Sequence, residues 1–369
     1  MTASCSVAID DANLSPIAAA MAAFFVFDIS FLAIFCLPKI CIFRKFADMK
    51  QYNKPPLTYR QQVELLKSRG LIFESAEQEA KAEMRLMTIS YYRLSGYMIP
   101  FKKKSGGCIA DDFKFGTTWS QIYSLYKFDR KLRILIFDAI EKIEVAIRCQ
   151  IVYQLSHKYG SHWQDVPSIF QVRRKVLSDG SIETIDVFSE IQNHIKDQLS
   201  KRIPEVFIEH YKNTYESPTN PPSWMCVEVM YFKHLSRICT SLAKRSDLND
   251  IAAFFDLPPK IFTSWLHTMN YVRNLCAHHA RLWNREINIE PALLSFSKRH
   301  KWLSNPTSEN RRKLYYFIAM INYLLQTVNP DSSFTRRLKE LFVEFSEAKK
   351  GAMGFPDNWE DEILCRNLK

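Results

Sequence analysis

A guanidinium, a carboxamide and two imidazoles fall within seven residues of this chain, from Arg273 to His279. An arginine is always charged and its planar fork matches phosphate oxygens, while a histidine can donate or accept a proton near neutral pH. The R-x4-H spacing of Arg273 and His278 therefore indicates a site that holds a phosphodiester and moves a proton. We take Arg273, Asn274 and His278 as candidate catalytic residues. His279, which would make the spacing R-x5-H, is the secondary candidate.

A predicted helix positions these residues. Pro258-Pro259 indicates its start, and its buried stripe should comprise Ile261, Phe262, Trp265, Met269, Val272 and Cys276. Arg273 borders this stripe, so it should be partly buried and needs a partner or a ligand. On an ideal helix His278 lies about 140° round and ~7.5 Å up from Arg273, and the two do not converge. Either the helix loosens at 277–279, or two copies meet about a two-fold axis.

The rest of the chain predicts an all-α fold. GxGxxG, P-loop, GxSxG and HExxH motifs do not occur, and only nine glycines are present. Thr58-x-x-Gln61 is a capping box for a helix that Gly70 ends. Thr118-x-x-Gln121 opens a helix of about 40 residues at most, or two with a bend, that ends at Gly160. Further helices are expected at about 223–244, 247–256, 259–278, 309–328 and 333–348.

Two other segments carry charged residues that need an interpretation. Asp129 lies on the apolar seam of the long helix, which consists of Ile122, Leu125, Leu132, Ile136, Ala139, Ile143 and Ala146. Asp129 has a structural role, in which it pairs with a buried arginine or caps a neighbouring helix, or it orients the catalytic Arg or His without contacting the substrate itself. Residues 161–222 contain many prolines and predict short helices around the core. Their basic run 173–175 is interpreted as a solvated loop, and contact with phosphate is the alternative.

Charge and cysteine content bound the class of protein. The net charge is +11; residues 1–48 carry three basic and four acidic side chains, so the remainder carries +12. Such a field attracts polyanions such as RNA. The nine cysteines form no C-x-x-C pair, which favours free thiols in a reducing cytoplasm over disulfides or zinc. We therefore predict a cytoplasmic protein with no metal site and no cofactor.

Residues 1–48 form an apolar N-terminal extension ahead of a domain at 49–369. The segment 14–43 is strongly apolar, but Asp28 near its middle would cost roughly 2.5 to 3.5 kcal/mol in a spanning helix. The uncharged run before Asp28 is also shorter than the usual ~20 residues. The extension is thus a membrane anchor, a soluble addition, or an artefact of a start codon that really lies at Met49.

The string from Arg273 to Glu286, RNLCAHHARLWNRE, resembles the nuclease motif of the HEPN superfamily in the form found in Abi-D/Abi-F type abortive infection proteins. Residues 54–58 with 62–66, and the run SYYRLSGY at 90–97, resemble that family's N-terminal signature. Residues 126–133 and 140–148 resemble its central helix, and MGFP at 353–356 with Trp359 resembles its ending. The resemblance runs in order from about residue 54 to 365.

The resemblance implies a HEPN-like helical bundle with additional helices and a metal-independent endoribonuclease of a phage-defence or toxin–antitoxin system. RNA would be the substrate, the protein a homodimer, and an RNA or protein antitoxin a further partner. His278 would move the proton while Arg273 binds the phosphate. Candidate RNA contacts are Tyr92, Arg93, Arg130, Arg133 and Arg281. The alternative is a non-catalytic RNA-binding or partner-binding protein of the same fold, with a membrane anchor in residues 14–43 as a further option.

Overall fold

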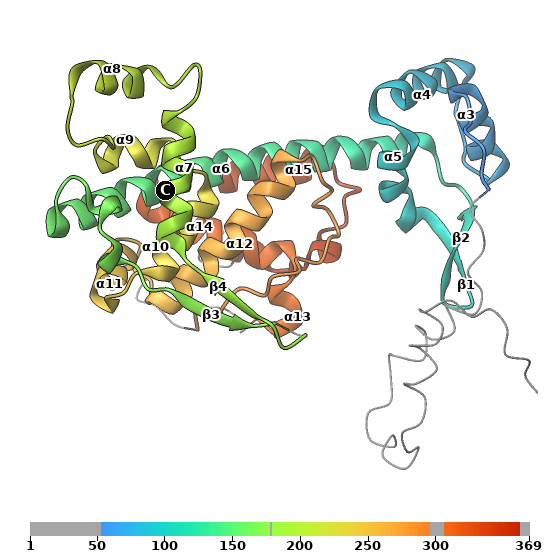
Figure 1. The fold of residues 1–369 in the computed structure, drawn as a ribbon. Coiled ribbons are helices and arrows are strands. Elements are labelled where there is room, and N and C mark those ends of the chain that lie inside the picture. Colours follow the sequence, from blue (N-terminus) through green and yellow to red (C-terminus); the bar gives the residue numbers. More distant parts are fainter. Residues whose placement is uncertain (1–52, 178, 296–305, 362–369) are drawn as a thin grey trace, which may run out of the picture. The chain divides into compact units, whose positions relative to one another are not determined.

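The computed structural model describes residues 53–177, 179–295 and 306–361 (Figure 1). The chain divides into two compact units, Met1–Leu57 and Thr58–Lys369, and the second is described here by itself. The expectations for the apolar segment 14–43 lie outside the described residues. Within the described ranges, no helix is both long enough and apolar enough to cross a membrane.

From residue 53 onward, three helices and a hairpin precede the long helix. α3 (Tyr59–Ser68) begins at Thr58, whose side chain and that of Gln61 form the predicted capping box. α4 (Ala76–Ile89) follows a cap at Ser75, and α5 (Tyr91–Met98) begins directly behind it. A short 3-10 turn, η2 (Ile99–Phe101), leads into the antiparallel strands β1 (Lys102–Ser105) and β2 (Cys108–Phe113).

The long helix is a single element, α6 (Trp119–Tyr159), of 41 residues. Thr118 and Gln121 form its capping box, and Gly160, at φ 86°, ends it, as the sequence predicts. Its predicted seam is buried except for Ala146, which is half-buried. α6 packs against α5, α9, α10, α11, α12, α14 and α15, and Figure 1 shows it running from α5 to the helices α9 to α11. It is therefore the element on which the fold is assembled.

Residues 161–222 contain a hairpin that the sequence analysis did not predict. After two 3-10 turns, η3 (Trp163–Asp165) and η4 (Pro167–Ile169), strand β3 (Arg173–Val176) pairs antiparallel with β4 (Ile182–Ile185). The loop interpretation of 173–175 is therefore wrong, although these side chains are exposed, as expected of a solvated run. The valine in β3 and the isoleucines in β4 favour strands. In β3 this apolar signal is outnumbered by three consecutive basic residues, which favour an exposed loop. α7 (Val187–Leu199) and α8 (Val206–Thr214) complete the segment.

The C-terminal half is helical at the predicted places, with two breaks. The helix expected at 223–244 is α9 (Ser223–Glu228) and α10 (Phe232–Ser241), because Tyr231 is extended and caps α10 through His234. α11 (Arg245–Phe254) and α12 (Pro259–Ala277) follow. The helix expected at 309–328 is interrupted at Lys313, which is extended, and forms α13 (Ser308–Arg311) and α14 (Leu314–Val328).

The core lies between α6 and α14. Every residue of α14 from Leu314 to Leu325 is buried, as expected of a helix that is apolar all round. α15 (Phe334–Glu344) covers α6, and two 3-10 turns, η5 (Lys350–Met353) and η6 (Trp359–Asp361), close the described chain. Among the described residues, helices dominate and the strands form only two small hairpins, so the predicted all-α class is confirmed.

Candidate functional site

The motif helix α12 ends inside the motif. Its predicted stripe is buried except for Ile261, which is half-buried. Ala277 is its last residue, His278 leaves helical geometry at φ −86° and ψ 12°, and His279 is left-handed at φ 56°. The amide of His279 donates to the Cys276 carbonyl at 3.0 Å and that of Ala280 to the Leu275 carbonyl at 2.8 Å. This is a Schellman ending, and it begins at the place where the sequence analysis allowed the helix to loosen.

Arg273 is partly buried beside the acid Glu144 of α6, as its position on the stripe predicted. Its side chain is 31% exposed, and its Nε lies 3.9 Å from Oε2 of Glu144. Its guanidinium also lies over the ring of Phe137, 5.8 Å from the centroid. The Nε makes no hydrogen bond to any described residue. Asn274 accepts only a long contact, 3.5 Å, from Nη1. The guanidinium is thus held between Glu144 and Phe137, and its side chain remains partly exposed.

Glu144 is the charge that faces Arg273, and it also contacts a second arginine. Its Oε1 lies 3.3 Å from Nη2 of Arg148 on the next turn of α6. Burial raises the pKa of Glu144, and the positive charges of Arg148 and Arg273 oppose that rise. Sequence reasoning missed Glu144. The signal was the spacing of Phe137, Glu141, Glu144 and Arg148, which places them on one face of α6 beside the apolar seam.

A groove of about 990 Å³ lies beside the end of α12. Its lining includes Arg93 from α5, Arg130 and Arg133 from α6, and His279 from the motif. Arg93 and Arg130 are exposed, and Nη1 of Arg93 donates to the backbone carbonyl of His279. The groove thus brings together four of the residues that the sequence analysis selected.

Other candidates lie outside that lining. His278 is exposed but does not line the groove. Tyr92 is 90% exposed, and the side chain of Arg281 lies against Gly96 of α5. Asp138 and Glu141 line the groove as well, so its charge is mixed and its basic part is the region of Arg93 and Arg130.

Asp129 is fully buried and accepts hydrogen bonds from three parts of the chain. Tyr97 of α5 donates to its carboxylate at 2.6 Å, and Arg133 forms an ion pair with it. The backbone amides of Leu282 and Trp283 donate at 3.1 and 2.6 Å. Burial raises the pKa of Asp129, and these four donors work against that rise. The expected pairing with a buried arginine is confirmed. The amide contacts, which sequence reasoning missed, fix the segment that follows the two histidines.

Comparison with known proteins identifies a family for the part of the chain that carries the site. The model of the Abi-like protein family matches residues 84–284, which is more than half of the chain and includes α6, α12 and the motif. The chain therefore belongs to the Abi-like protein family, and this membership suggests a role in abortive infection, a form of phage defence. No curated protein and no solved structure matches the chain.

The Asp129 contacts predict a large loss of stability on their removal. Asp129→Ala should lower the free energy of unfolding by about 3–5 kcal/mol, because it leaves Arg133 buried without its partner and two amides unsatisfied. Urea denaturation measures this. The matched control is Asp138→Ala on the same helix, whose ion pairs with Lys142 and Arg337 are about 40% exposed and are worth less than about 1 kcal/mol. Equal losses in the two variants would contradict the assignment.

The left-handed backbone of His279 predicts an unusual order of substitutions. His279→Gly should be more stable than His279→Ala by about 1 kcal/mol, because only glycine adopts this conformation without strain. At His267, exposed within α12, the order should reverse, since glycine costs up to about 1 kcal/mol against alanine inside a helix. Thermal unfolding of the four variants tests both orders. A His279→Ala protein as stable as His279→Gly would refute the Schellman ending.

Proposed function

We propose that this chain is a metal-independent endoribonuclease of an abortive-infection or toxin–antitoxin system, acting in the cytoplasm. One observation carries the proposal. α12 ends between Arg273 and the two histidines, so a partly exposed guanidinium near the end of the helix is followed within six residues by two exposed imidazoles. Of these groups, His279 lines a groove that also presents Arg93 and Arg130, and the Arg273 guanidinium lies over Phe137 of the same lining. This is an arrangement suited to binding a phosphodiester and moving a proton.

The chemistry follows from these side chains. His278 takes the proton of an RNA 2′-hydroxyl, whose oxygen then attacks the adjacent phosphorus, or it protonates the leaving 5′-oxygen. Arg273 binds the non-bridging oxygens and stabilises the charge that builds on them. The products are a 2′,3′-cyclic phosphate and a 5′-hydroxyl. His279 is the alternative candidate for the proton transfer, because it lines the groove while His278 does not.

The groove supplies contacts for single-stranded RNA. Arg93 and Arg130 are exposed there and can pair with phosphates. Tyr126 and Phe137 line it with aromatic surface on which bases can stack. Tyr92, which is 90% exposed on α5, and Arg281, which lies against Gly96 of α5, are further candidate contacts outside the lining. Asp138 and Glu141 repel phosphate, so the RNA backbone follows the Arg93 and Arg130 region.

A symmetric homodimer is part of the proposal. Exposed apolar side chains lie on two of the helices that line the groove, namely Met84 and Met87 on α4 and Ile134 and Phe137 on α6, which are 59%, 47%, 51% and 37% exposed. A second copy packed on this face would bury them and bring its own motif to the same cleft. Each cleft would then draw Arg273 from one chain and His278 from the other. An RNA or protein antitoxin that covers the groove would block it.

The alternative is a non-catalytic RNA-binding or partner-binding protein of the same fold. The basic charge, +11 for the whole chain, and the aromatic lining of the groove support binding without requiring cleavage. The two functions differ in one measurable respect, because only the nuclease converts RNA to shorter products.

Substitution of the two key residues should remove RNA cleavage. The purified protein should cleave tRNA or total RNA in EDTA, and Arg273→Ala and His278→Ala should each lower the rate about 100-fold or more. Gel analysis of labelled RNA measures the rate. Lys260→Ala and His267→Ala, which remove a cation and an imidazole from other positions of α12, are the controls and should cleave normally.

The outcomes separate the alternatives. His279→Gly, which keeps the left-handed backbone, decides between the two histidines: a loss greater than that of His278→Ala would transfer the proton role to His279. Variants that cleave as fast as the parent would overturn the catalytic assignment. RNA binding without cleavage by any of these proteins would establish the non-catalytic alternative.

Mixing two inactive variants tests the shared cleft. A mixed dimer of Arg273→Ala and His278→Ala chains keeps one complete cleft if each cleft uses Arg and His from different chains. After unfolding and refolding together, an equal mixture should recover roughly a quarter of the parent rate, since half of the dimers are mixed and each has one working cleft. Chains refolded separately are the control. A fully active monomer, or no recovery in a mixture that forms dimers, would refute the shared cleft.

A further inference from the structure

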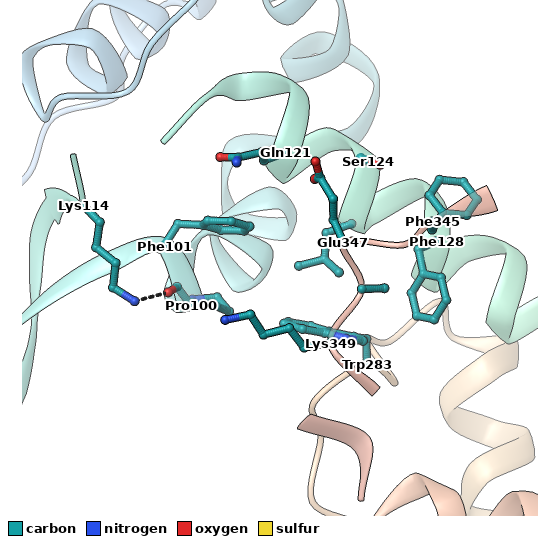
Figure 2. A pocket seen from close by; sticks show the side chains of 12 residues that line it. Pro100, Phe101, Lys114, Gln121, Ser124, Phe128, Trp283, Phe345, Glu347 and Lys349 are labelled. Atoms are coloured by element: carbon teal, nitrogen blue, oxygen red, sulfur yellow. Dashed lines mark hydrogen bonds between the residues drawn. The ribbon is translucent and has the colours of Figure 1, made fainter. Parts of the chain in front are cut away.

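A second pocket, which shares no lining residue with the groove, includes Trp283, whose backbone amide donates to Asp129. It has a volume of about 400 Å³, within the range of small-molecule sites. Its residues come from η2, the end of β2, α6, the chain after the motif, and the chain after α15. Figure 2 shows Phe101 with Pro100 and Lys114 on one side of it, and Phe128 with Phe345 on the other. Aromatic rings thus face the pocket from several elements.

Trp283 gives this pocket a polar group without a partner. The side chain lines the pocket and is 3% exposed. Its Nε1 is buried and makes no hydrogen bond to any described residue. An indole N–H only donates, and a buried donor left unpaired costs about as much as a lost hydrogen bond. A ligand that fills the pocket and presents an acceptor would remove that cost.

The charged lining favours an anion. Lys114 and Lys349 line the pocket against one acid, Glu347. Lys114 donates to the carbonyl of Pro100 at 2.7 Å, which holds its ammonium near the rim (Figure 2). Lys349 is exposed. Flat aromatic walls, one unpaired donor on a lining residue and a pair of cations match a flat heteroaromatic ring that carries both an acceptor and a negative group.

We infer that this pocket binds a nucleotide, with the base between the aromatic rings and accepting from Trp283, and the phosphate beside Lys114 and Lys349. The nucleotide is either free or the unstacked end of an RNA strand, since both present the same chemistry. The site does not depend on the proposed cleavage. It is, however, connected to the motif, because the Trp283 amide is held by Asp129 four residues after His279.

The test measures binding to protein that carries Arg273→Ala, so that RNA stays intact and failure of the nuclease proposal does not affect the result. AMP, GMP, CMP, UMP, a trinucleotide and inorganic phosphate are titrated by calorimetry. At least one nucleotide or the trinucleotide should bind with a Kd below about 1 mM. Trp283→Phe, which keeps a ring and removes the donor, should weaken binding about three- to tenfold.

A second variant and a control keep the result decisive. Ser124→Trp, on α6 at the pocket wall, should abolish binding because the new side chain fills the space while residue 283 remains tryptophan. Lys104→Ala on β1, outside the lining, should leave binding unchanged. Binding of mononucleotides supports a free nucleotide, and binding of the trinucleotide alone supports an RNA end. The inference is overturned if the parent binds neither, if both pocket variants bind as the parent does, or if phosphate binds as tightly as any nucleotide.

Discussion

The buried carboxylate of Asp129 is the interaction on which the site depends. It joins α5 through Tyr97, α6 through Arg133, and the chain behind the motif through the amides of Leu282 and Trp283. A charge in a fully buried position persists only if nearly all its hydrogen-bonding capacity is used, and four donors achieve that here. Because the amide partners follow the histidines by a few residues, the same contact determines where the chain goes when α12 ends.

The sequence predicted the local elements better than the contacts between them. Capping boxes at Thr58 and Thr118 located two helices, because the cap and its partner lie within four residues. The breaks at Tyr231 and Lys313 were missed, since single extended residues between apolar runs carry no strong local signal. The hairpin of β3 and β4 was missed because the charged run in β3 indicated a solvated loop. At the site, partial burial of Arg273 followed from helical periodicity. The bond from Asp129 to Trp283 joins positions too far apart in sequence for any spacing rule.

Two concave regions border the segment that Asp129 fixes. The groove contains His279 and the pocket contains Trp283, four residues further on. A ligand in the pocket would contact Trp283, whose backbone amide donates to Asp129. Ligand binding would therefore affect the same short segment that follows the motif. Coupling between two sites needs such a shared element with a contact to each. Under the proposed function, this would link a nucleotide signal to the residues proposed to bind RNA.

The central claim is that the motif uses the 2′-hydroxyl of RNA as the nucleophile. The most direct measurement follows one oligonucleotide with a defined cleavage position, made once as RNA and once with a single 2′-deoxy sugar on the 5′ side of that position. The account predicts that the all-RNA strand yields a 2′,3′-cyclic phosphate and a 5′-hydroxyl by mass spectrometry, and that the deoxy strand is not cut there. Cleavage of both strands at equal rates, or products with a 5′-phosphate, would contradict it.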